Sequence, residues 1–142
     1  MARYLIQVAM LLAATAYAWR RGGWPEWVAA AILGAMFAID RLYHFLVAAP
    51  QYRQLDLWHM SLDLVVLAAI VALALRAPRT WLLWMASLQL ISALGHGLHV
   101  LEVGMPWLVY WTMTTAPSYM QILLLAAGTF LNDPRRRARR TT

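Results

Sequence analysis

The sequence predicts an all-α integral membrane protein, with five transmembrane helices in a compact bundle. Hydrophobic residues make up 63% of the 142 positions, which is too many for an ordinary soluble domain. The charged residues gather at the ends and in short gaps between long apolar runs, and the chain has eight tryptophans, a residue enriched at membrane–water boundaries. We therefore expect one membrane domain over residues 1–132 and a basic tail over residues 133–142.

The first apolar run, residues 4–19, predicts a short helix of roughly 24 Å at the usual rise per residue, which tilting could fit to a bilayer. Ala16-Tyr17-Ala18 near its end imitates the cleavage site of a signal peptide. Arg20 and Arg21 directly follow, however, and would then sit on the translocated side. We treat the run as a retained span. The alternative is four spans, with this helix lying on the surface or cleaved.

The other four apolar runs are bounded by proline, glycine and charged residues, which end or begin helices. They predict helices over residues 27–49, 55–75, 81–101 and 107–131. Pro117 falls inside the last run and predicts a kink there. Thr114 or Ser118 could help to satisfy the backbone groups that this proline leaves without partners.

The distribution of the arginines predicts the orientation of the five spans. One side collects Arg20, Arg21, Arg76, Arg79 and the tail arginines Arg135, Arg136, Arg137, Arg139 and Arg140, whereas the other has only Arg3 and Arg53. The positive-inside rule places the arginine-rich side in the cytoplasm, with the N-terminus outside and a bacterial inner membrane as the expected location. The net charge of +6 then indicates contact with anionic lipid headgroups and not with nucleic acid.

Several classes of site are excluded by composition. The chain has no Cys, so it forms no disulfide, catalytic thiolate or cysteine-ligated iron–sulfur cluster. It also has no Lys, so a retinal Schiff base cannot form. No glycine-rich phosphate loop is present, since Gly22-Gly23 is an isolated pair in a basic turn.

Polar residues form a stripe on the helix expected over residues 81–101. Gln89, Ser92, His96 and His99 are spaced by three, four and three, so they share one side of a helix. Polar groups in hydrocarbon cost free energy and tend to be kept only where they have partners. The stripe therefore predicts polar groups on neighbouring helices.

Those groups are found on the second and third predicted helices. Asp40 and His44 lie one turn apart, and His59 and Asp63 repeat the same spacing. Because the helices alternate in direction, all four histidines fall in one layer roughly 5–9 Å below one surface, with Asp40 and Asp63 roughly 12–14 Å deep. This layer is expected in the outer half of the bilayer.

Imidazole and carboxylate groups together predict a transition-metal site for Fe, Zn or Cu. The candidate ligands are His44, His59, His96, His99, Asp40 and Asp63. The residues expected to orient the ligands are Gln89, Ser92, Glu102 and Tyr119. Haem b is the alternative cofactor, held by two histidines, with Arg41 at a propionate and Gly97 giving clearance for the macrocycle.

The sequence leaves the function open among three classes. An embedded metal site could support redox chemistry on a quinone or lipid, metal-assisted hydrolysis or metal transport. The protein could instead be a non-enzymatic subunit of a homo-oligomer or larger membrane complex, with its polar groups joined in structural pairs such as Arg41 with Asp63. Proton or ion movement through the same layer is the third class.

Overall fold

The computed structural model describes residues 2–47, 52–101, 104 and 106–133, and in this part of the chain it is all-helical. The five helices are α1 (Ala2–Arg21), α2 (Trp24–Leu46), α3 (Tyr52–Arg76), α4 (Thr80–Val100) and α5 (Trp107–Asn132). The prediction of five helices is confirmed. The bounds differ from the predicted ones by up to three residues, since α2 ends at Leu46 and α3 begins at Tyr52.

The first turn of the bundle explains how α1 and α2 lie against each other. The Gly22 amide donates to the Ala18 carbonyl at 2.8 Å, and a Cβ on Gly22 would lie 2.6 Å from both that oxygen and the Glu26 Cβ. Only glycine fits such a close approach. The Glu26 carboxylate then accepts the Gly23 amide at 2.9 Å, which satisfies a free donor at the start of α2.

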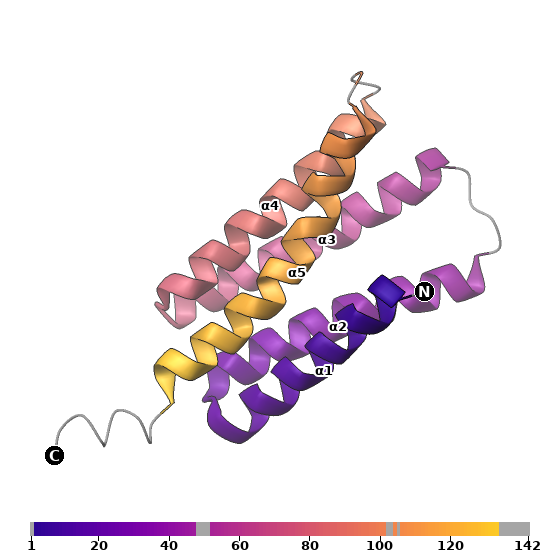
Figure 1. The fold of residues 1–142 in the computed structure, drawn as a ribbon. Helices are drawn as coiled ribbons and strands as arrows, with labels where there is room; N and C mark the ends of the chain where they lie inside the picture. The colour runs from indigo at the N-terminus through magenta and orange to yellow at the C-terminus, as the bar shows by residue number, and fades with distance from the viewer. Residues whose placement is uncertain (1, 48–51, 102–103, 105, 134–142) are drawn as a thin grey trace, which may run out of the picture.

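The helices form a closed ring in which each packs on its sequence neighbours and α5 also packs on α1 and α2. Figure 1 shows α1 beside α2 and α3 beside α4, with α5 lying across the two pairs. Short connections force neighbours to alternate in direction. The C-terminal half of α2 therefore lies beside the N-terminal half of α3.

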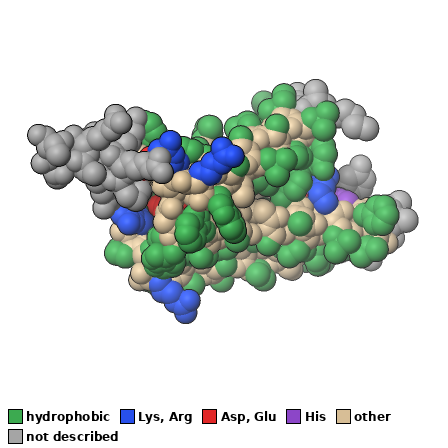
Figure 2. Space-filling view, turned by 90° about the horizontal axis from the view of Figure 1, so that it is seen from below, with side chains coloured by type: hydrophobic (Ala, Val, Ile, Leu, Met, Phe, Trp, Pro, Cys, Tyr) green, Lys and Arg blue, Asp and Glu red, His purple; other side chains and the backbone are tan. Residues whose placement is uncertain are grey.

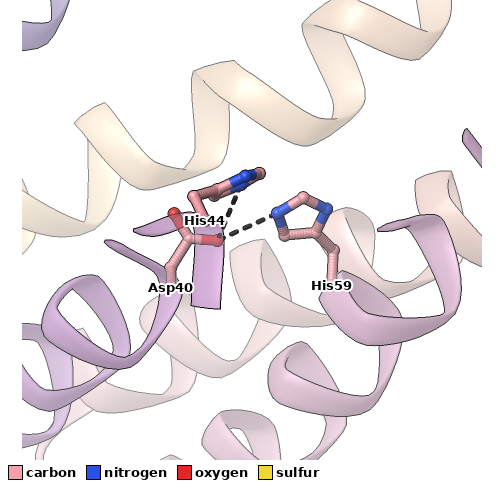
Figure 3. Close-up of side chains that lie close together, drawn as sticks. All are labelled: Asp40, His44 and His59. Atoms are coloured by element: carbon pink, nitrogen blue, oxygen red, sulfur yellow. Dashed lines mark hydrogen bonds and ion pairs between the residues drawn. The ribbon is translucent and has the colours of Figure 1, made fainter. Parts of the chain in front are cut away.

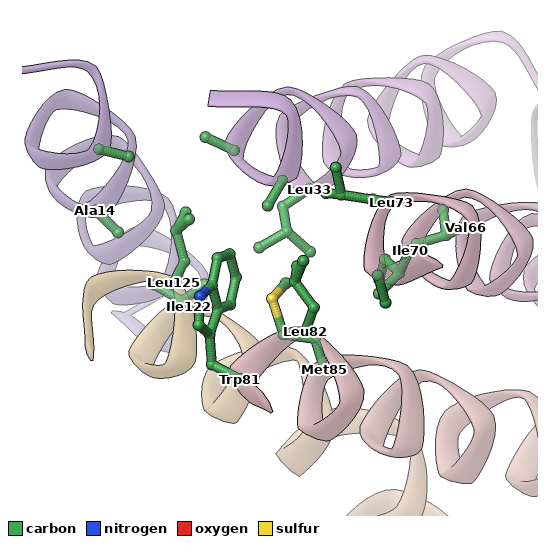
Figure 4. Close-up of a cluster of buried hydrophobic side chains, with 14 of the residues drawn as sticks. Ala14, Leu33, Val66, Ile70, Leu73, Trp81, Leu82, Met85, Ile122 and Leu125 are labelled. Atoms are coloured by element: carbon green, nitrogen blue, oxygen red, sulfur yellow. The ribbon is translucent and has the colours of Figure 1, made fainter. Parts of the chain in front are cut away.

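An apolar core fills the half of the bundle that contains the α1–α2 and α3–α4 turns (Figure 4). Ile70, Leu82, Met85 and Leu125 are fully buried there, and Trp81 packs among them. Gly128 makes room for Trp81, because a Cβ at that position would come within 2.6 Å of the indole ring. The other half of the bundle contains the histidines, Asp40 and Asp63.

The outer surface is strongly apolar, as expected for contact with lipid. Leu75 and Phe45 are 82% and 85% exposed, and Figure 2 shows hydrophobic side chains spread over the face in view, with arginines mainly toward one end. Three segments are long and apolar enough to cross a membrane: Trp24–Leu46, Leu57–Arg76 and Thr80–His99. The fold is therefore membrane-compatible.

The prediction of five spans is not confirmed, because α1 and α5 fall outside this group. In α1, Gln7 and the arginines Arg20 and Arg21 lower the hydropathy. In α5, three threonines and Pro117 interrupt the first half. Thr114 and Ser118 do not bond the carbonyl that Pro117 leaves free; their hydroxyls donate to the carbonyls of Tyr110 and Thr115 instead.

Candidate metal centre and polar cavity

Two helices bring one carboxylate and two imidazoles together. Asp40 and His44 lie one turn apart on α2 and so share a face, and α3 presents His59 to the same point. Asp40 Oδ1 lies 2.9 Å from His59 Nε2 and 3.7 Å from His44 Nε2 (Figure 3). The donor atoms of the three residues all lie within 4.8 Å of one another, a spacing that could hold a metal ion.

The second oxygen of Asp40 has a different partner. Arg41 donates to Asp40 Oδ2 through Nε and Nη2. The guanidinium lies over the rings of Tyr4 and Phe37, with its central carbon 5.3 Å and 5.7 Å from the ring centroids. The predicted pairing of Arg41 with Asp63 is therefore wrong for the described contacts, because the adjacent Asp40 is within reach of the guanidinium.

The imidazoles continue the group from helix to helix. The centroid of the His59 ring lies 5.4 Å from that of His44 and 5.2 Å from that of His96, on which it stacks. His96 Nδ1 lies 3.3 Å from the Tyr110 hydroxyl, and the His99 ring lies 4.6 Å from the ring of Tyr110. The four histidines thus lie in one connected run, but His96 and His99 are not in the group whose donor atoms could share one ion.

Asp63 lies in a buried hydrogen-bonded network with side chains of α4 and α5. Its Oδ1 accepts from Gln89 Nε2 at 2.8 Å, and its Oδ2 accepts from the Ser92 hydroxyl at 2.6 Å. Gln121 Nε2 donates in turn to Gln89 Oε1 at 2.7 Å and to the Met85 carbonyl at 3.2 Å. Two neutral donors from α4 therefore solvate a carboxylate that is 2% exposed, and Gln121 of α5 supports one of them. Asp63 is not grouped with Asp40 as a ligand of one ion.

A cavity of about 280 Å³ connects the two groups, and all five helices contribute to it. One wall is apolar and comes mainly from α1 and α2, with Leu11, Leu33 and Phe37 among its residues. The facing wall is formed by α3, α4 and α5, and it is mainly polar although Leu62 and Ile122 belong to it. Its polar side chains are His59, Asp63, Ser92, His96, Thr114, Thr115, Ser118 and Gln121. Asp40 and Arg41 also line the cavity, so the possible metal group borders it.

Two residues of this region were missed by the sequence reasoning. Gln7 on α1 lines the cavity and donates to the Ser118 hydroxyl at 3.1 Å, and Gln121 completes the network around Asp63. Each is an amide inside a long apolar run. That isolation is a signal that could have identified them, since a buried amide needs hydrogen-bond partners.

The remaining predicted residues lie elsewhere or outside the described residues. A Cβ on Gly97 would meet only Met60 Sδ at an ordinary 3.6 Å, so no close approach depends on this glycine. Gly95 is the tight position, with Met113 Cβ and Thr114 Cγ2 both at 3.1 Å from such a Cβ. Tyr119 does not appear among the cavity-lining residues, and Glu102 is outside the described residues. Their predicted roles stay predictions.

The described arrangement gives no support to haem. Two haem ligands must point at one iron from opposite sides of the macrocycle. His59 and His96 instead stack face to face, with 25° between their planes, and His59 Nε2 is directed at Asp40. The donor set fits a bare metal ion better, because two imidazoles and one carboxylate occur as ligands of both catalytic zinc and non-haem iron.

Comparison with protein-family models, curated proteins and solved structures found no match to this chain. The functional argument therefore depends on the site itself.

Proposed function

We propose that this protein holds a divalent transition metal inside the membrane, with Asp40, His44 and His59 as its protein ligands. One observation carries the proposal: the donor atoms of these three residues converge within 4.8 Å from two packed helices. A three-ligand ion keeps a further coordination position for water or substrate. The neighbouring cavity is the space from which a ligand would reach that position.

The donor spacing supports this assignment. Ligands at about 2.0–2.1 Å from a tetrahedral ion are about 3.3 Å apart. The distances from Asp40 Oδ1 to the two imidazole nitrogens, 2.9 Å and 3.7 Å, lie on either side of that value. Arg41 balances the second oxygen of Asp40 and fixes the orientation of the carboxylate. When bound, the ion would polarise a substrate oxygen or activate a water.

Metal binding to the purified protein tests the proposal. The protein would carry no polyhistidine tag, and its metal content would be measured by mass spectrometry after dialysis against zinc, iron(II) or copper(II). We expect about one ion per chain, with affinity reduced at least tenfold in His59→Ala. His99→Ala is the matched control, because it removes an imidazole that lies on Tyr110 and not beside Asp40.

Undiminished metal binding by His59→Ala and His44→Ala would refute the assignment, as would equal losses in His99→Ala. The affinity should also fall as the pH is lowered, because an imidazole must lose its proton to bind a metal. An absorption spectrum distinguishes the cofactor classes: a haem band in purified protein would favour haem b over the bare ion.

The proposed setting is a bacterial inner membrane that all five helices cross. The N-terminus is outside, and the arginine-rich end faces the cytoplasm. Arg20, Arg21, Arg76 and Arg79 belong to two turns at the same end of the ring, which supports this orientation. The metal group is then in the outer half of the bilayer, and the tail arginines meet anionic lipid headgroups.

A groove between α1 and α2 favours a second candidate function, that of a subunit in a homo-oligomer or larger complex. The groove has a volume of about 440 Å³, and Ala30 and Gly34 line it one turn apart. Small residues at this spacing allow helices to approach closely in membranes. The mass of the particle in nanodiscs tests this candidate, and a strictly monomeric protein would count against a homo-oligomer.

Proton or ion transport has less support. Beyond the cavity, the polar network reaches the Met85 carbonyl through Gln121. The apolar core around Leu82 and Leu125 follows in the same direction among the described residues (Figure 4). A relay would need polar groups through that core.

A further inference from the structure

The hydrogen-bond polarity of the cavity wall indicates what the cavity can bind. A hydroxyl or amide group that has already given its hydrogen to the protein can offer a ligand only an oxygen acceptor. The wall can therefore be classified side chain by side chain, from bonds made within the bundle.

Three of the four hydroxyl groups on this wall have their hydrogens engaged, and the fourth, that of Thr115, makes no such described bond. Ser92 donates to Asp63 Oδ2 at 2.6 Å, and Thr114 donates to the Tyr110 carbonyl at 3.0 Å. Ser118 donates to the Thr115 carbonyl at 2.8 Å. All three side chains line the cavity and can accept a hydrogen bond from a ligand, although Ser118 already accepts one from Gln7.

The amides of Gln121 and Gln7 also use amide hydrogens within the bundle. Gln121 Nε2 donates to Gln89 Oε1 and to the Met85 carbonyl, so its carbonyl oxygen is what it can offer to a ligand. Gln7 uses one amide hydrogen on Ser118. The carboxylates of Asp40 and Asp63 add further acceptors. Arg41, His59, His96 and Thr115 carry hydrogens of their own, but Ser92, Thr114, Ser118 and Gln121 offer a ligand only acceptors. A ligand that bonds these four side chains must donate the hydrogen.

The charge and shape of the cavity narrow the class of ligand. Arg41 lines the cavity and a metal ion at Asp40, His44 and His59 would add positive charge beside it, which disfavours an ammonium group. The facing apolar wall, with Leu33 and Phe37, suits a hydrocarbon body. A cavity of about 280 Å³ has room for a ring or a short chain and not for a whole lipid.

We propose that the cavity binds the hydroxyl head of a neutral, membrane-soluble phenol, quinol or alcohol. The hydroxyl donates to the acceptor side chains of the polar wall, Ser92, Thr114, Ser118 or Gln121, beside the three proposed metal ligands. This inference deepens the proposed function, since it names the substrate class of the same site. Its binding step needs no metal, so it can be measured with metal-free protein and judged separately from metal binding.

The test compares two probes that differ in one donor. Metal-free protein in nanodiscs is titrated with 4-octylphenol, which has a hydroxyl hydrogen, and with 4-octylanisole, in which a methyl group replaces it. Empty nanodiscs correct for partition into lipid. We expect saturable binding of the phenol, about three- to tenfold tighter than that of the anisole, as one hydrogen bond would give.

Thr114→Val keeps the shape of the side chain but removes the acceptor oxygen, so the preference for phenol should fall toward parity. Thr112→Val is the matched control: Thr112 makes the same bond to the carbonyl four residues earlier but is exposed on the other side of α5. If Thr114→Val fails to fold, Ser118→Ala replaces it, with the exposed Ser87→Ala as its control.

Equal affinity for the two probes, tighter binding of the anisole, or absence of saturable binding overturns the proposal. So does an equal effect of the cavity variant and its exposed control. A protein that prefers phenol yet retains no metal supports this inference and refutes the metal assignment, and the converse result does the opposite.

Discussion

At the scale of single residues, Gly97 of α4 and Gly128 of α5 differ in how closely a neighbouring side chain approaches them. The sequence pointed to Gly97 as the position where a bulky group needs clearance. In the structure Gly97 has an ordinary neighbour, whereas Gly128 lies directly against the indole of Trp81. The difference cannot be derived from helical spacing, because it depends on which side chain the neighbouring helix presents.

Gly128→Ala should therefore destabilise the protein. Its Cβ would lie 2.6 Å from the Trp81 ring, and relieving this overlap should cost about 1–3 kcal/mol. Gly97→Ala is the matched control, since its Cβ would meet Met60 Sδ at 3.6 Å, and its effect should be small. Thermal unfolding in detergent measures both variants. A Gly128→Ala protein as stable as the parent would contradict the packing described around Trp81.

For the histidines, the sequence predicts a common layer but does not predict the partner of each side chain. Their common layer follows from the lengths of the helices, and the structure places all four in one connected run from His44 to His99. Their partners do not follow from sequence. His59 meets Asp40, whereas His99 lies against Tyr110.

At the scale of elements, the apolar runs predict each helix to within three residues of its observed bounds. Whether an element crosses the bilayer is a separate matter. The second, third and fourth helices contain segments apolar enough to do so, but α1 and α5 have polar residues on the sides that face the cavity and each other. Gln7 and Ser118 bond between these two helices. Mean hydropathy therefore understates how apolar their outward sides are.

Labelling of introduced cysteines tests whether α1 spans the membrane. The chain has no native cysteine, so a single substitution gives one reactive thiol. If α1 crosses, a membrane-impermeant maleimide should label Ala2→Cys in intact spheroplasts and should label Thr142→Cys only after the membrane is opened. Protection of Ala2→Cys together with Thr142→Cys would favour the four-span alternative, with α1 on the cytoplasmic surface.

At the scale of the whole molecule, the two halves of the bundle along the helix axes differ in the residues that they contain. The half near the α1–α2 and α3–α4 turns contains the apolar core, and the other half contains the cavity and the three residues that could hold a metal. A ligand would therefore enter from one side or from the lipid and would not pass through. The orientation of the bundle then decides which membrane surface lies nearer to the cavity.

The orientation of the bundle is tested with thiols at the two ends of α4. Thr80 is exposed at its start, and Gly104, with no atom within 4 Å of an added Cβ, follows its end. We expect the impermeant maleimide to label Gly104→Cys in intact spheroplasts and Thr80→Cys only after permeabilisation. The reverse pattern would place the metal group in the cytoplasmic half of the bilayer and overturn the orientation proposed from the arginines.

The sequence by itself determined the helical class, the positions of the five helices and the polar side of α4, because apolar runs, breakers and a period of 3.6 residues are local properties. Only the tertiary structure decided which polar groups meet. Asp40 joins His44 and His59, and Asp63 joins Gln89 and Ser92, because the rotation and tilt of packed helices depend on contacts such as Gly128 with Trp81. The cavity is a product of the same packing, since each of its walls comes from different helices.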